Sequence, residues 1–169
     1  MAATYEPIAT TTLATAATSI TLSSIPGTYT DLKLVIVATT AANDSFWINL
    51  NGTTGTSTLY SNTDLYGTGT SVASSRSTNQ PYFNPSGSNI IGTTIPSMYI
   101  MDFLNYSNTT TNKTCLINWP GDNNTSGGVV CSVGMYRSTS AITSIKIQNT
   151  GSVNFSIGTT VTLYGIKAA

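Results

Sequence analysis

Side chains that could carry acid–base or metal chemistry are scarce in this chain. It has no histidine, two cysteines and six acidic residues among 169 residues. Histidine is the commonest proton carrier and metal ligand near neutral pH, so its absence excludes Ser-His-Asp and Cys-His catalysis as well as histidine zinc sites. The acids occur singly along the chain, as Glu6, Asp31, Asp44, Asp64, Asp102 and Asp122. We therefore predict that the protein is not an enzyme and has no catalytic residue and no metal site. A carboxylate pair for glycoside cleavage is the alternative, because a sequence does not give the distance between two acids.

The segment 122–127, Asp-Asn-Asn-Thr-Ser-Gly, is similar to the start of a calcium-binding loop. The twelfth position of such a loop should be a bidentate glutamate, and here it is Val133. We therefore predict a tight polar turn at 122–127. The chain also lacks the G-x-x-x-x-G-K-[S/T] phosphate loop, and no cofactor is expected.

Charged residues make up 7% of the chain, against about a quarter in an ordinary soluble domain. Six basic and six acidic residues give a formal net charge of zero and are spread along the sequence. Nucleic-acid binding needs a basic stripe that neutralises phosphates, so we predict no nucleic-acid partner. A net charge near zero promotes association, which suits a chain that works inside a protein assembly.

Neither a secretory signal nor a membrane span is expected. The first residues lack a basic start followed by an apolar run, and the longest apolar stretch, 32–38, is far shorter than the roughly 20 residues that span a bilayer. We therefore expect a protein made in a cytoplasm, without a membrane partner. Cys115 and Cys131 are expected to be small buried apolar residues; the alternative is a cross-strand disulfide formed after release from the cell.

Short β-rich runs separated by turn residues recur along the whole chain, and no segment has a helical period with capping residues. Strands are predicted at 19–22, 31–38, 46–50, 98–106, 114–119, 129–136, 142–147, 153–157 and 160–166. One domain covering 1–169 is expected, and about eight to ten short strands predict an all-β fold. The favoured architecture is an antiparallel β-sandwich that is jelly-roll-like, with a barrel as the alternative. The last three strands are expected to form a meander.

Two regions fall outside this strand pattern. Residues 1–24 predict an extended N-terminal arm plus the first strand, with Tyr5, Ile8 and Leu13 as candidate subunit contacts. The arm pairs within its own sheet or reaches onto a neighbouring subunit by strand addition. Residues 51–96 form a long loop region in which a strand is expected near 57–66.

The long loop region also contains the candidate loop contact surface, made by Tyr60, Tyr66, Tyr82 and Phe83. Tyrosine among Ser, Gly and Asn is typical of adaptable binding surfaces. The alternative is that these rings pack beneath the loop or between subunits, where tyrosine is also enriched.

Several phrases near both ends of the chain resemble one family. They are ATYEPIATTTL at 3–13, SITLSSIP at 19–26, YTDL at 29–32, NLNG at 49–52, LYG at 65–67 and GTTVTLYGI at 158–166. As a set they are similar to small virion structural proteins of tailed bacteriophages, and the likeness is thin from 72 to 114. The resemblance implies a component of the virion and transfers no catalytic residue.

These features together predict a non-enzymatic structural component of a tailed-phage virion, located in the virion after assembly in the host cytoplasm. The favoured role is a capsid decoration or cement protein that stabilises the particle through subunit contacts. Its partners would be copies of itself, as a homotrimer by analogy with such assemblies, and other virion proteins. The alternative is a tail fibre or baseplate protein whose Tyr-rich loops contact a host receptor or surface glycan.

Overall fold

Eleven β-strands and no helix are found in the part of the chain that the computed structural model describes, residues 4–53, 55, 57–84, 91–122, 127–151 and 153–167. The strands are β1 (Tyr5–Thr12), β2 (Ser19–Leu22), β3 (Asp31–Ala38), β4 (Phe46–Leu50), β5 (Tyr60–Gly67), β6 (Val72–Gln80), β7 (Ser97–Leu104), β8 (Lys113–Asp122), β9 (Gly127–Tyr136), β10 (Ile145–Asn149) and β11 (Thr160–Ile166). None of these described residues lies in a helix that could cross a membrane.

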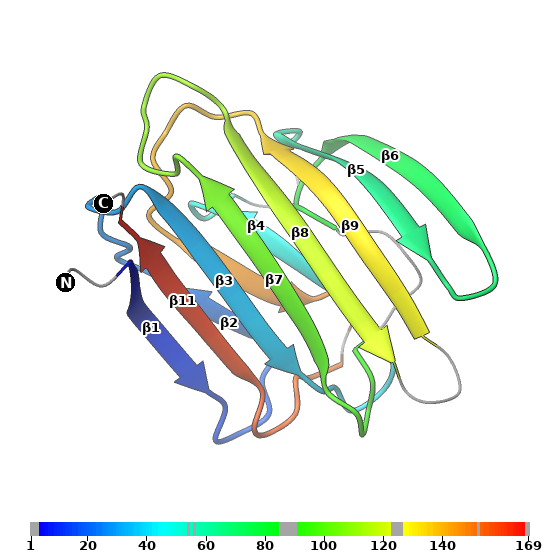
Figure 1. Ribbon diagram of the computed structural model, residues 1–169. Helices are drawn as coiled ribbons and strands as arrows, with labels where there is room; N and C mark the ends of the chain where they lie inside the picture. Colours follow the sequence, from blue (N-terminus) through cyan, green and yellow to red (C-terminus); the bar gives the residue numbers. More distant parts are fainter. Residues whose placement is uncertain are drawn as a thin grey trace.

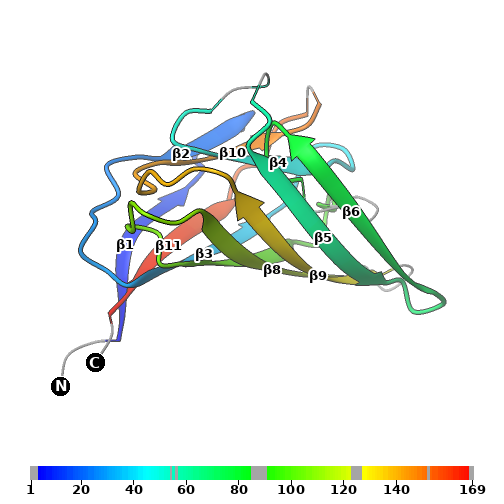
Figure 2. The ribbon, with the colours of Figure 1, turned by 90° about the horizontal axis from the view of Figure 1, so that it is seen from above.

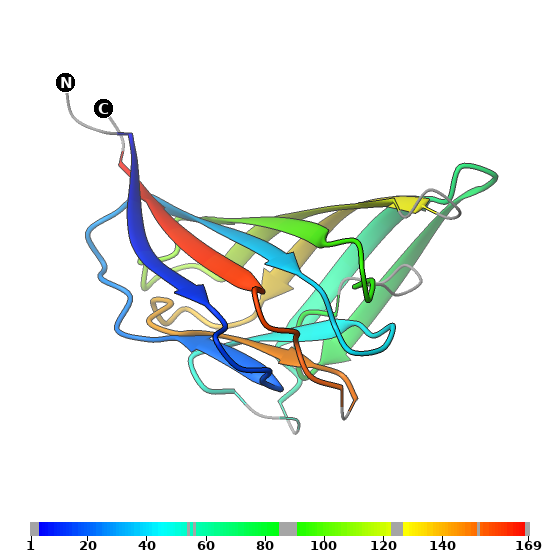
Figure 3. The same cartoon turned by 90° about the horizontal axis from the view of Figure 1, so that it is seen from below.

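The strands form two antiparallel sheets that pack face to face. The large sheet has eight strands in the order β1-β11-β3-β7-β8-β9-β5-β6, and the small sheet has three in the order β2-β10-β4 (Figure 1). Seen from above and below, the small sheet covers one face of the large sheet, and the tip of the β5–β6 hairpin protrudes beyond it (Figures 2 and 3). The all-β sandwich predicted from the sequence is therefore confirmed. The jelly-roll-like arrangement stays a prediction, since sheets of eight and three strands do not by themselves show it.

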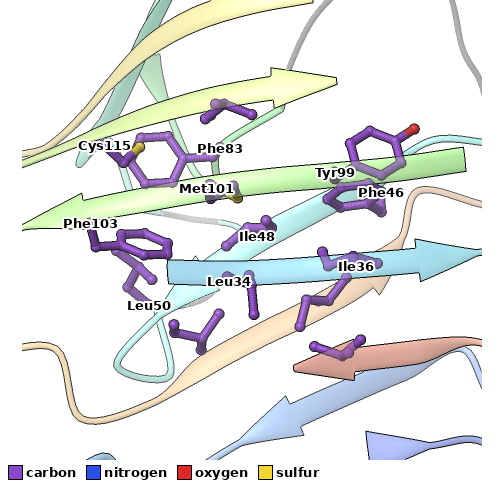
Figure 4. Packing of buried hydrophobic residues seen from close by; sticks show 14 of the residues in the cluster. Leu34, Ile36, Phe46, Ile48, Leu50, Phe83, Tyr99, Met101, Phe103 and Cys115 are labelled. Atoms are coloured by element: carbon purple, nitrogen blue, oxygen red, sulfur yellow. The ribbon is translucent and has the colours of Figure 1, made fainter. Parts of the chain in front are cut away.

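The core lies between the two sheets and follows from strict alternation along the strands. In β3, Leu32, Leu34, Ile36 and Ala38 are buried, and the residues between them face outward. Their neighbours come from Tyr99, Met101 and Phe103 on β7 and from Phe46, Ile48 and Leu50 on β4, which point into the same space (Figure 4). The Phe46 and Tyr99 rings meet edge to face across the sandwich, with centroids 4.4 Å apart, a favoured aromatic geometry.

The predicted meander of the last three strands is wrong. β10 belongs to the small sheet and β11 to the large sheet. Between them, Phe155 makes isolated bridges to Ala17 and Thr40, while its side chain is fully buried. Phe155 thus fills the end of the core between the sheets, while Val153 is half-buried and Ile157 is 68% exposed, so 153–157 does not form the predicted strand.

The N-terminal segment pairs within its own sheet, which is one of the two alternatives predicted for it. β1 is the edge strand beside β11, with a bulge between Pro7 and Ala9. Glu6 binds Lys167 with a 2.8 Å ion pair and accepts a 3.1 Å hydrogen bond from the Tyr29 hydroxyl. These contacts tie β1 to the segment before β3 and to the end of β11.

The region 51–96 is mostly ordered into strands. β5 confirms the strand expected near 57–66, and β6 was not predicted. Residues 54, 56 and 85–90 of this region lie outside the described part of the chain. After β6 the chain returns to the small sheet, where Ile48 and Phe83 exchange two backbone hydrogen bonds of 3.0 Å.

Candidate interaction surface

The outer face of the large sheet exposes an unusual amount of apolar side chain. Among the described residues, nine of the eleven large hydrophobic side chains that are exposed lie on this face. They are Tyr5, Val37, Leu65, Val72, Met98, Leu104, Leu116, Val129 and Val133. Monomeric soluble proteins seldom leave so extended an apolar surface in water, and such faces mark sites of protein contact.

Strand pairing arranges these side chains in cross-strand rows. Leu116 on β8 lies opposite Val133 on β9, and Cys131 on β9 lies opposite Leu65 on β5. From β3 to the β6 edge, the exposed fraction increases from 39% at Val37 to 64% at Val129 and 76% at Val72, while Tyr5 on the opposite edge strand is 53% exposed. The apolar surface is therefore centred on β8, β9 and β5, and we call its members Leu65, Val72, Leu116, Val129, Cys131 and Val133 the outer patch.

Charges of both signs border the outer patch. Lys33 and Asp102 form a 2.5 Å ion pair on neighbouring strands and are about one-quarter exposed. Arg76 on β6 lies opposite Thr63, beyond Val133 in the same cross-strand row. Asp31 accepts a hydrogen bond from the Asn105 amide at one end of the sheet, and Asp122 is exposed at the other. No single sign dominates this face, which leaves little to attract a polyanion.

The sequence contained a signal for this face that alternation alone did not reveal. The runs Leu34–Val37 in β3 and Met98–Met101 in β7 are apolar at inward and outward positions alike. Continuous apolar runs are typical of strands covered on both faces. In this chain the small sheet covers only the inner face of the large sheet, so the outward apolar residues of these strands are left without a cover.

The candidate arm contacts are spread over both faces of β1 and the turn after it. Tyr5 is 53% exposed on the outer face of the large sheet. Ile8 and Leu13 are half-buried and pack against the core of their own chain. Leu13 also exchanges two 2.9 Å backbone hydrogen bonds with Gly158 and Thr159. Of the three, Tyr5 alone presents most of its side chain at the surface.

Two members of the candidate loop contact surface are corrected by the structure. Tyr60 and Phe83 are buried in the core, with ring centroids 4.8 Å apart in an edge contact. The Tyr60 hydroxyl accepts a 2.8 Å hydrogen bond from the Leu50 amide and is 2.5 Å from the Thr53 hydroxyl. Burial raises the pKa of Tyr60 to about 12. The alternative prediction, that these rings pack beneath the loop, is confirmed for both. Tyr60 points inward from β5, and Phe83 is held against β4 by its backbone hydrogen bonds with Ile48.

Tyr82 lies at the surface, where its ring stacks on Trp47, a contact that was not predicted from the sequence. Its ring stacks on Trp47 with centroids 4.0 Å apart and planes 11° from parallel, and both residues are half-buried. Gln148 lies opposite Trp47 on β10, so the stacked pair borders the polar outer face of the small sheet. Tyr66, the fourth candidate, is half-buried and packs against the core.

The two cysteines lie on opposite faces of the large sheet and are both free. Cys115 is buried on the inner face, where burial raises the pKa of its thiol. Cys131 is exposed on the outer face, within the outer patch. The prediction of a buried apolar cysteine is therefore confirmed for Cys115 and wrong for Cys131. A bond between the two within one chain is not formed, since the sheet separates their side chains.

Within the described ranges, no three His, Cys, Asp or Glu side chains gather closely enough to hold a metal ion. Most of the polar turn predicted at 122–127 falls on residues 123–126, which lie outside those ranges.

No protein-family model, curated protein or solved structure matches this chain.

Proposed function

We propose that this chain is a non-enzymatic structural subunit of a tailed-phage virion, acting as a capsid decoration or cement protein. It stabilises the particle by binding copies of itself and other virion proteins. The observation that carries this proposal is the outer face of the large sheet, with its nine exposed large apolar side chains.

An apolar face of this kind supports a role in a permanent assembly. Each exposed valine or leucine that a partner covers contributes about 25 cal/mol per Å² of apolar area removed from water. The low charge of the chain reduces the cost of removing ions from water when subunits pack. Both properties favour a subunit whose neighbours are always present.

Purified virions of the phage that encodes this chain provide the test. We expect the protein in many copies per particle by quantitative mass spectrometry, and density for it on the capsid shell by electron microscopy. Absence of the protein from the particles would contradict the virion role. Density confined to the tail would contradict the decoration role alone.

The second candidate is a tail fibre or baseplate protein that contacts a host glycan, and the Trp47–Tyr82 pair favours it. Aromatic faces beside amide and hydroxyl groups suit the mixed apolar and polar surface of a sugar. Gln148 and Lys146 on β10 and Ser19 and Thr21 on β2 share the outer face of the small sheet with Trp47.

Trp47→Ala tests this second role by the loss of binding to host surface glycans, measured by titration calorimetry and by virion adsorption. Ile157→Ala, at an exposed apolar residue outside both faces, is the control and should leave glycan binding unchanged. Absence of glycan binding by the native protein would remove this candidate.

A further inference from the structure

We propose that the occupant of the outer patch is a second copy of this chain, packed face to face about a twofold axis that runs along β9. This deepens the proposed function, since it names the partner of the face that carries it. It rests on the register of five strands, β7, β8, β9, β5 and β6.

The row through Val133 is complementary to itself when reversed. In strand order it reads Asp102, Leu116, Val133, Thr63 and Arg76. A twofold axis along β9 places Val133 on its own copy and brings Asp102 on β7 opposite Arg76 on β6 of the second chain. Asp102, whose carboxylate also binds Lys33 of its own chain at 2.5 Å, thereby meets Arg76 of the other chain, twice in the dimer.

In the two neighbouring rows the axis places the β9 residue against its own copy. One row runs from Ile100 through Asn118, Cys131 and Leu65 to Ser74, so Cys131 meets Cys131, Leu65 meets Asn118 and Ile100 meets Ser74. The other runs from Pro120 through Val129 to Gly67 and Val72. In this row Val129 meets itself, and the most exposed apolar residue, Val72, faces the Met98 end of the second sheet. The contact is therefore apolar along β9, which follows the axis. It is charged on either side, at Asp102 on β7 and at Arg76 on β6.

Arg76 supplies a charge that the monomer does not use in an ion pair. It forms no ion pair with any described residue, and its guanidinium donates a 3.5 Å hydrogen bond to the Thr63 hydroxyl. β5 and β6 turn toward the small sheet at their Tyr60 and Gln80 ends (Figure 2). Arg76 lies on β6, the edge strand of the large sheet, and so at the rim of the contact. Rim charges of this kind set the orientation of a complex more than its affinity.

The size of the surface is at the lower limit for a stable pair. As a flat surface, five strands about 4.8 Å apart and about 26 Å long would present roughly 600 Å², the lower end of what each partner buries in a standard interface. The turn of β5 and β6 toward the small sheet reduces this area (Figure 2). Two twisted sheets also pack well when their strands run within about 30° of each other, as in a β-sandwich.

The test is the mass of the native chain in solution, by sedimentation equilibrium over a range of concentrations. We expect twice the 17.7 kDa of one chain. Val133→Asp puts two carboxylates on the axis and should give the mass of a monomer. Ile157→Asp, at an exposed apolar residue in the loop before β11, is the matched control and should leave the mass doubled.

Two further measurements separate this contact from any other dimer. Oxidation with diamide, which takes up the two electrons and two protons, should join two chains through a Cys131–Cys131 disulfide, because the axis sets these thiols against each other and Cys115 is buried. Arg76→Asp should weaken pairing through repulsion from Asp102, and adding Asp102→Arg should restore it, whereas Lys146→Asp on the small sheet should have no effect.

A monomeric native chain, a mass of three chains, or a folded Val133→Asp variant that stays paired would each overturn the proposal. Three copies cannot share one twofold contact, so the homotrimer implied by the resemblance would need another surface. The measurement is made on the isolated protein, whereas the virion role is judged on particles. Either proposal can therefore fail without the other.

Discussion

Gly134 is a residue whose missing side chain decides how the core packs. It lies on the inner face of β9, opposite Cys115. A Cβ atom placed there would lie 2.6 Å from the Phe83 ring and 2.7 Å from the Cys115 sulfur. Both neighbours are buried at 1% exposure and cannot move aside cheaply. The glycine thus lets the ring of Phe83 close the core above β8 and β9.

Gly134→Ala should therefore lower the free energy of unfolding by about 1–3 kcal/mol, the usual cost of overpacking. Urea denaturation followed by tryptophan fluorescence measures this loss. Gly128→Ala, in the same strand, is the control, because its nearest contact would be an ordinary 3.6 Å. Equal stability of the two variants would show that the core near Phe83 adjusts.

At the scale of elements, the edge strand β1 depends on a charged cluster at its start. The Lys167 ammonium, which binds Glu6 directly, holds the pKa of the Glu6 carboxyl below its usual range. The Glu6 carboxylate in turn raises the pKa of Lys167, and burial raises the pKa of Tyr29. Gly165 on β11 leaves the space for the Tyr29 ring, which a side chain there would overlap.

These directions set the pH window of the cluster. Glu6 contributes stability above its unfolded pKa, and this contribution is lost as the pH falls through the lower folded pKa. Lys167 and Tyr29 contribute below their unfolded pKa values and lose their contributions as the pH rises through the higher folded values. The cluster should therefore stabilise β1 between about pH 5 and pH 10.

Glu6→Gln should lower the thermal midpoint modestly within that window and leave it unchanged in acid, where Glu6 is protonated in both states. Calorimetry between pH 3 and pH 9 measures the difference from the native chain. Tyr29→Phe, which keeps the ring over Gly165, should have a smaller effect. A constant difference at every pH would mean that the charge of Glu6 does not act through Lys167.

The elements differ in how far the sequence could predict them. β3 and β4 match their predicted bounds, because Leu32, Leu34 and Ile36 alternate clearly and turn residues follow. β6 has little apolar alternation, and as an edge strand of Ser, Thr and Asn it was hidden within the long loop region. β1 is likewise rich in Thr, and its partner β11 lies more than 140 residues further along. Such long-range pairing is not visible in local pattern.

The candidate surface was harder to predict than the fold, for a related reason. Tyr60 and Phe83 lie among polar residues in sequence, yet the strand register turns both into the core. The outer patch instead comes from residues on strands β5, β6, β8 and β9, which the sequence assigns to cores or loops. Only the register shows that one face of the large sheet has a cover and the other does not.

At the scale of the whole molecule, the large sheet has an inner face that the small sheet covers and an outer face that is open. Cys115 lies on the inner face and Cys131 on the outer face. Cys131 on the open side should react rapidly with Ellman's reagent in the native protein. Cys115 should react only as fast as the chain unfolds, because its side chain is buried and its thiol pKa is raised. One thiol per native chain and two per denatured chain are expected.

The rate of the fast Cys131 reaction, measured at several protein concentrations, tests whether pairing of two chains covers this thiol. If copies pair along β9, Cys131 lies on the axis, and its reaction should slow as the protein concentration rises through the range in which the mass doubles. Cys131→Ser should abolish the fast phase and leave the unfolding-limited phase intact. Two fast thiols in the native chain would contradict the sidedness of the sheet. A rate independent of concentration, in a protein that has doubled its mass, would place the contact on another face.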